Sequence, residues 1–143
     1  MSRDHEKLEV FHDSHHLTLR IYRFTKDFPR DESFGLRAQM RRAAVSVPSN
    51  IVEGSAKPTT RDYVKFLNVA LGSASELRYL VILAGELDFL DEQGRAELPE
   101  RCERVVKKLE KLVHSMEGRA ASEGARHTQG GSRKPEAGRR DGL

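Results

Sequence analysis

The sequence predicts an all-α protein, an antiparallel up-down-up-down four-helix bundle with a disordered C-terminal tail. Apolar residues recur at steps of three and four through most of the first 117 residues, the spacing of one helix face. No window alternates apolar and polar residues between hairpin turns, so strands are not expected. The connecting segments are short, and short loops between helices favour antiparallel neighbours. The predicted bundle domain covers residues 1–118.

The first predicted helix covers about residues 10–27. It is expected to end at Phe28, because the residue before a proline, here Pro29, is pushed out of helical geometry. Its apolar face is formed by Val10, Ser14, Leu17, Ile21, Phe24 and Phe28.

The second predicted helix covers about residues 34–56 and contains Pro48. A proline has no amide hydrogen and crowds the carbonyl four residues back. We therefore expect the helix to bend or loosen around Ala44 to Val47, and Ser46 and Asn50 to satisfy the freed carbonyl.

The third helix is expected at about residues 60–89, where Thr59 and Asp62 stand in a capping-box-like relation. The fourth is expected at about residues 92–117, beginning near Asp91 and stopping at Gly118.

The basic charge of the chain belongs to its tail, predicted as residues 119–143. Six of the 25 Lys and Arg and three of the 22 acids follow residue 118, which leaves 19 of each in the body. The tail is rich in Gly, Ser and Arg and nearly free of large apolar residues, so it is expected to be disordered. Its cations either contact phosphates or are solvated without a partner; the phosphate candidates are Arg133, Lys134, Arg139 and Arg140.

The second and third helices carry more apolar surface than a monomeric bundle needs. We expect a homo-oligomer whose interface uses both helices, against the alternative of a bundle with scattered apolar surface residues. The interface residues are Ala38, Val45, Val52, Val64, Leu71 and Ile82.

A polar stripe runs beside the apolar face of the second helix. With Glu76 of the third helix, it consists of Gln39, Arg42, Ser46, Pro48, Asn50 and Glu53. Arg42 is expected to form a structural ion pair with Glu76 or Glu53, and the alternative is a phosphate contact. Arg41 lies about 100° away on the helix, so it is expected to point outward, where it is a second candidate for phosphate contact.

The run QMRRAAVSVPSNIVEG, preceded by Phe28-Pro29 and followed by FLNVALGSASEL, resembles the four-helix-bundle family encoded in ribosomal RNA intervening sequences. The chain is similar, more distantly, to accessory variability proteins of diversity-generating retroelements. The resemblance covers about residues 8–117. It implies a ring-like homopentamer without known catalytic activity, and nucleic-acid binding is reported or proposed for the retroelement relatives.

Catalytic and metal chemistry find little support in the residues. A Glu53 and Glu76 carboxylate pair is the remote enzymatic alternative, weighed against pairing with arginine. A di-iron bundle site requires two Glu-x-x-His units, which this chain does not supply. His12, His15 and His16 are better explained as a solvated helix end than as metal ligands, and Cys102 as a small core residue. No cofactor is expected.

We therefore predict a non-catalytic homo-oligomeric scaffold, possible partners being RNA, DNA or another protein. The alternative is a dedicated nucleic-acid-binding protein that uses a basic face and the tail. No apolar run is expected to span a membrane, the start MSRDHEKLEV does not resemble a signal peptide, and the cytoplasm is the expected compartment.

Overall fold

Four long helices form the architecture of the computed structural model, which describes residues 3–130. They are α1 (Glu9–Thr25), α2 (Leu36–Ser55), α3 (Thr60–Glu86) and α4 (Glu92–Gly130). Two short 3-10 helices, η1 (His5–Lys7) and η2 (Arg30–Glu32), precede α1 and α2. No strand occurs within residues 3–130, so the all-α prediction is confirmed.

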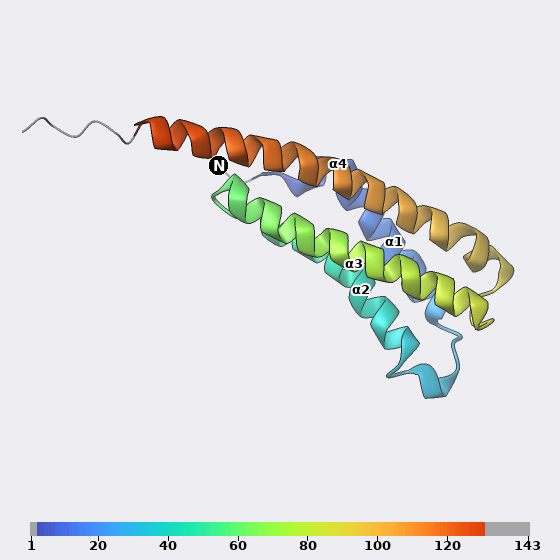
Figure 1. Ribbon diagram of the computed structural model, residues 1–143. Coiled ribbons are helices and arrows are strands. Elements are labelled where there is room, and N and C mark those ends of the chain that lie inside the picture. The colour runs from blue at the N-terminus through green and yellow to red at the C-terminus, as the bar shows by residue number, and fades with distance from the viewer. Residues whose placement is uncertain (1–2, 131–143) are drawn as a thin grey trace, which may run out of the picture.

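Consecutive helices run in opposite directions and pack side by side (Figure 1). Helix α4 returns to pack against α1, which closes the ring of four helices around one core. The largest fully buried side chains are contributed by all four helices and include Leu17, Ile21, Met40, Ile51, Leu67, Leu77, Leu98 and Leu109.

Local chemistry explains both ends of α3 and the start of α4. The Thr59 hydroxyl accepts a hydrogen bond from the Asp62 amide at 3.1 Å and caps α3, as the spacing predicts. The Asp91 carboxylate caps α4 by accepting from the Gly94 amide at 2.8 Å. Helix α3 ends at Glu86, three residues before the predicted end, and Asp88 then adopts a left-handed turn with φ of 61°.

The fourth helix does not stop at Gly118. It continues to Gly130 and projects past the end of the bundle where α2 turns into α3 (Figure 1). Residues 119–126 are mostly Ala, Arg, Glu and Ser, and an Arg119 to Glu123 ion pair at 3.8 Å spans one turn, so the helix already nucleated in the bundle propagates. The rest of the predicted tail, with Arg133, Lys134, Arg139 and Arg140, lies outside the described residues.

Two glycines permit close helix contacts. A Cβ atom added at Gly54 would lie 2.8 Å from Cβ of Phe66 on α3, and one at Gly94 would lie 2.9 Å from the ring of Phe24 on α1. Helices α2 and α4 therefore approach their neighbours at points where no larger residue fits without a shift.

Helix α3 meets the length and apolarity of a membrane span by composition alone, contrary to the expectation that no segment would. It packs between α2 and α4 in the bundle. A single core helix of this kind is weak evidence for a membrane.

Candidate functional site

The polar stripe of α2 meets α3 along one edge of the bundle. Arg42 donates to the Glu76 carboxylate at 2.5 Å, and the hydroxyls of Ser46 and Ser73 are 2.7 Å apart. The Asn50 side-chain amide donates to the Ser46 carbonyl at 2.7 Å. We call Arg42, Ser46, Asn50, Ser73 and Glu76 the α2–α3 seam. The structure thus selects Glu76, not Glu53, as the partner of Arg42.

The seam joins two helices, and its charged and hydroxyl groups already bind one another. Arg42 and Glu76 are 60% and 41% exposed, so their ion pair contributes at most about 1 kcal/mol. The small Ser46 and Ser73 side chains let the helix backbones approach, and each hydroxyl has a partner. These contacts are those of a packing interface.

The remaining residues of the polar stripe do not join the seam. Gln39 and Glu53 are exposed. Glu53 follows Arg42 by eleven residues on one helix, about 16 Å along its axis. Because Glu76 is bound to Arg42, the structure does not assemble the Glu53 and Glu76 pair that acid–base chemistry would need.

The carbonyl that Pro48 deprives of its partner is satisfied from another helix. The Thr18 hydroxyl oxygen of α1 lies 3.0 Å from the Ala44 carbonyl oxygen and 2.8 Å from the Ser14 carbonyl oxygen, so its single hydrogen is shared between the two acceptors. The prediction that Ser46 and Asn50 fill this role is wrong, because both face α3, whereas Ala44 faces α1. A hydroxyl on a preceding helix leaves no local sequence signal for such a contact.

Arg41 does not point outward as expected. Its Nε donates to the Thr25 hydroxyl at 2.9 Å, its terminal nitrogen donates to the Tyr22 carbonyl at 3.2 Å, and its guanidinium lies 4.5 Å from the Tyr22 ring centre. A cation at the carbonyl end of α1 interacts favourably with the helix dipole. Arg37 acts nearby, donating to the Phe28 carbonyl at 2.6 Å.

The predicted interface residues form two separate rows. Val45 and Val52 are 40% and 38% exposed and line a surface hollow of about 450 Å³ that also includes His15 and Thr18 of α1. With half-buried Ala38 they form what we call the α2 apolar row.

The second row lies on the opposite side of the helix pair. Ile82 is 42% exposed and lines another hollow with Arg95 and Pro99 of α4. With half-buried Val64 and Leu71 it forms the α3 apolar row. The α2 row thus borders α1 while the α3 row borders α4.

Other exposed apolar side chains were not singled out by the sequence pattern. Phe34, before α2, is 98% exposed, Tyr79 is 63% and Leu19 is 55% exposed. Helical spacing identifies core faces, but it does not show which non-core apolar residues a neighbouring helix covers.

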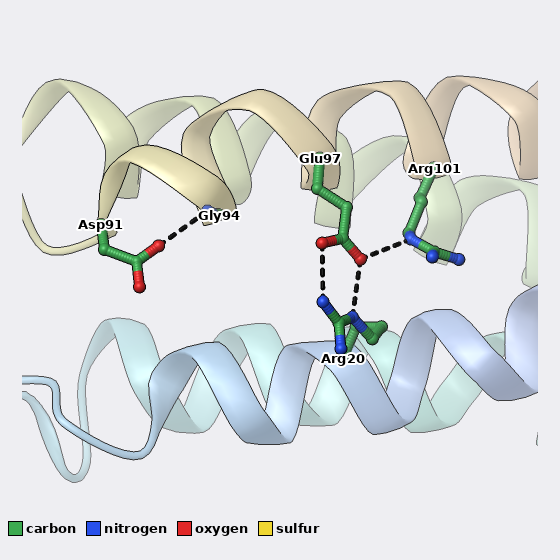
Figure 2. A network of polar contacts seen from close by, with 5 residues as sticks. All are labelled: Arg20, Asp91, Gly94, Glu97 and Arg101. Atoms are coloured by element: carbon green, nitrogen blue, oxygen red, sulfur yellow. Dashed lines mark hydrogen bonds and ion pairs between the residues drawn. The ribbon is translucent and has the colours of Figure 1, made fainter.

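An ionic network joins α1 to α4 (Figure 2). Glu97 accepts two hydrogen bonds from Arg20, at 2.6 and 2.7 Å, and a third from Arg101 at 2.7 Å. The Arg20 hydrogen bonds lower the pKa of Glu97, and the same contact raises the pKa of Arg20. About three turns beyond Glu97 on α4, Lys108 pairs with Glu9 at 2.7 Å and with Asp13.

Cys102 is fully buried in the core, as predicted, and burial raises the pKa of its thiol to about 12. The histidines of α1 do not assemble into a cluster. Within residues 3–126, no group of three or more His, Cys, Asp or Glu side chains is placed to hold a metal ion. The single Glu-x-x-His unit, Glu9 to His12, is engaged elsewhere, since Glu9 binds Lys108 and a His12 ring nitrogen lies 2.6 Å from the Glu6 carbonyl.

Comparison with known proteins identifies the family. A protein-family model described as 23S rRNA-intervening sequence protein matches residues 6–111. A solved structure, of a protein with unknown function from the S23 ribosomal protein family of Bacteroides thetaiotaomicron, is similar with a TM-score of 0.65 and 22% identity. The similarity covers 73% of this chain and 95% of that one, and at this identity it shows a shared fold. No curated protein matches the chain.

Proposed function

We propose that this chain, which belongs to the family of 23S rRNA-intervening sequence proteins, acts as a non-catalytic homo-oligomeric scaffold in the cytoplasm, which holds nucleic acid or a partner protein. The observation that carries the proposal is the pair of exposed apolar rows. Each is longer than a single stray side chain, and each occupies a face that the core of this subunit does not use.

The position of the rows favours a head-to-tail contact. The α2 row borders α1 and the α3 row borders α4, so one subunit presents two different apolar surfaces on different flanks. An isologous dimer would bury the same patch twice and leave the other row in water. Packing the α2 row of one copy on the α3 row of the next buries both, and such a contact generates a closed ring when its rotation allows. A pentamer is the ring size that the family resemblance implies.

The absence of an assembled acid–base pair in the seam supports a scaffold over an enzyme. The seam residues Arg42 and Glu76 bind each other, and Arg41 binds the end of α1. Phosphate contact by either arginine would compete with these contacts, which favours the scaffold over the basic-face alternative.

Two single charge insertions test the head-to-tail contact. Val52→Glu blocks the α2 row and Ile82→Glu blocks the α3 row, so we expect each variant alone to lose the assembly in light scattering. Because Gln39 is exposed on α2 outside the row, Gln39→Glu adds the same charge as a matched control and is expected to leave the native mass unchanged.

Mixing the two variants gives the sharper result. The intact α3 row of Val52→Glu meets the intact α2 row of Ile82→Glu, so the mixture is expected to form a dimer that stops growing, with one subunit of each kind. A wild-type chain that scatters as a monomer at micromolar concentration contradicts the proposal. So does a mixture that remains monomeric while both single variants stay folded by circular dichroism.

A further inference from the structure

A continuous stripe of basic and hydroxyl side chains runs along α4. Its members follow one another at steps of three and four, so they share one side of the helix. We call this set the basic stripe; it consists of Arg101, Arg104, Lys108, Lys111, Ser115, Arg119, Ser122 and Arg126.

Three acidic side chains of the same helix lie on another side, whereas Glu97 and Glu123 contact stripe residues. Glu103, Glu110 and Glu117 recur at steps of seven on another side, and Glu103 lies near Arg78 of α3. A helix optimised only for stability gains from interleaving acids and bases at i and i+4. Helix α4 forms such pairs at Glu97–Arg101, Glu103–Lys107 and Arg119–Glu123, but no ion pair among the described residues uses Arg104, Lys111 or Arg126. These three exposed cations point to a use for the stripe outside the helix.

The stripe remains positively charged after its ion pairs are counted. Arg101 shares Glu97 with Arg20, Lys108 contacts Glu9 and Asp13, and Arg119 contacts Glu123. The other three cations, Arg104, Lys111 and Arg126, are exposed and have no ion pair within the part of the chain that the structure describes. With Arg20 of α1 added to the six cations of the stripe, seven cations lie along this flank beside five acids, namely Glu9, Asp13, Glu97, Glu100 and Glu123.

The position of the stripe leaves it accessible. Its contacts with Glu9, Asp13 and Glu97 place it on the α1 side of α4, whereas the α3 apolar row lies on the other side of α4. The projecting end of α4 extends it beyond the bundle (Figure 1). An assembly built through α2 and α3 would not cover it.

We propose that the basic stripe binds the phosphate backbone of a nucleic-acid duplex. Arg, Lys and Ser are the side chains that contact phosphates, and the 25-residue step from Arg101 to Arg126 spans about 38 Å, roughly one helical turn of a duplex. No aromatic side chain lies in the stripe to stack on bases, so the binding is independent of sequence. This inference rests on the nucleic-acid part of the proposed function and does not require the ring.

The test compares two triple variants of the full chain. The stripe variant is Arg104→Gln, Lys111→Gln and Arg126→Gln, and the matched control is Lys7→Gln, Arg30→Gln and Arg61→Gln, which removes three exposed cations outside the stripe. Binding is measured by fluorescence anisotropy on labelled 20-base-pair RNA and DNA duplexes of random sequence, between 50 and 200 mM salt.

We expect the stripe variant to lose ~10-fold or more in affinity at about 100 mM salt and to flatten the log–log salt slope by about three, while the control changes far less. Equal losses in both variants overturn the proposal, as does wild-type protein that binds neither duplex at 50 mM salt. Binding of anionic vesicles in preference to duplex also overturns it.

Light scattering on the same samples separates this result from the proposed scaffold. A monomer that binds duplex through the stripe contradicts the ring and supports the stripe. An oligomer whose duplex affinity is unchanged by the stripe variant supports the ring and contradicts the stripe.

Discussion

Two edges of the bundle, the contact of α2 with α3 and the contact of α1 with α4, are held together by different interactions. The α2–α3 edge relies mainly on close approach, with Gly54 against Phe66 and the Ser46 hydroxyl on Ser73, beside one exposed ion pair, Arg42 to Glu76. The α1–α4 edge relies on charge, with Arg20 and Arg101 bound to Glu97 (Figure 2). Farther along α4, Lys108 binds two acids. Steric fit is insensitive to salt and pH, whereas an ionic edge responds to both.

The largest expected effect lies at the α2–α3 edge, where Gly54 of α2 meets Phe66 of α3. Gly54→Ala places a methyl group 2.8 Å from Cβ of Phe66, and both atoms belong to stiff parts of the helices. Overpacking of this kind costs about 1–3 kcal/mol, of which the better helix propensity of alanine offsets up to about 1 kcal/mol. Urea unfolding measures the loss.

Gly72→Ala is the matched control, because a Cβ atom at Gly72 of α3 meets nothing within 4 Å in this subunit. It is expected to stabilise the chain by up to ~1 kcal/mol through helix propensity. Equal effects at both glycines would contradict the close packing of the α2–α3 edge at Gly54.

The ionic edge is expected to show the next largest effect and to depend on pH. Glu97→Gln should cost about 1–2 kcal/mol at neutral pH, because it weakens charge-assisted hydrogen bonds from two arginines whose side chains are 23% and 37% exposed. The folded pKa of Glu97 lies below its ordinary value, so this stabilisation is present above about pH 4.5 and is lost as pH falls through the folded pKa.

Unfolding of wild type and Glu97→Gln in urea at several pH values checks the sign. The difference between the two should shrink below pH 4.5 and also at 1 M salt. A difference that stays constant from pH 7 to pH 3 would show that the edge is held by packing instead.

A smaller effect is expected at the contact that joins α1 to the proline of α2. Thr18→Val removes the hydroxyl that donates to the Ala44 carbonyl and should cost about 1 kcal/mol. Pro48→Ala restores an amide that can donate to the same carbonyl, so Thr18→Val should cost less in that background. Additive costs in the double-mutant cycle would show that Thr18 and Pro48 are not coupled and would contradict this role of Thr18.

The structure also explains why some local predictions failed. The stop at Gly118 failed because glycine ends a helix reliably only where the backbone turns left-handed, and no glycine among the described residues has a positive φ. The helical wheel places Arg42 beside the polar stripe, where it finds one of its two expected partners, but it directs Arg41 outward, because it does not include the neighbouring helix α1. Arg41 found the end of α1, and Arg42 found Glu76.

The periodic apolar residues, the cap at Thr59 and the short loops by themselves determined four antiparallel helices with a core that includes Cys102, because burial and capping are local consequences of spacing and residue type. The motif around Pro48 likewise marked the family. Only the tertiary structure decided that Thr18 serves the Ala44 carbonyl, that Glu97 joins α1 to α4, and that the apolar rows lie on different flanks. Those contacts join residues far apart in the chain, and their geometry depends on how each helix is rotated against its neighbours, which helical spacing leaves open.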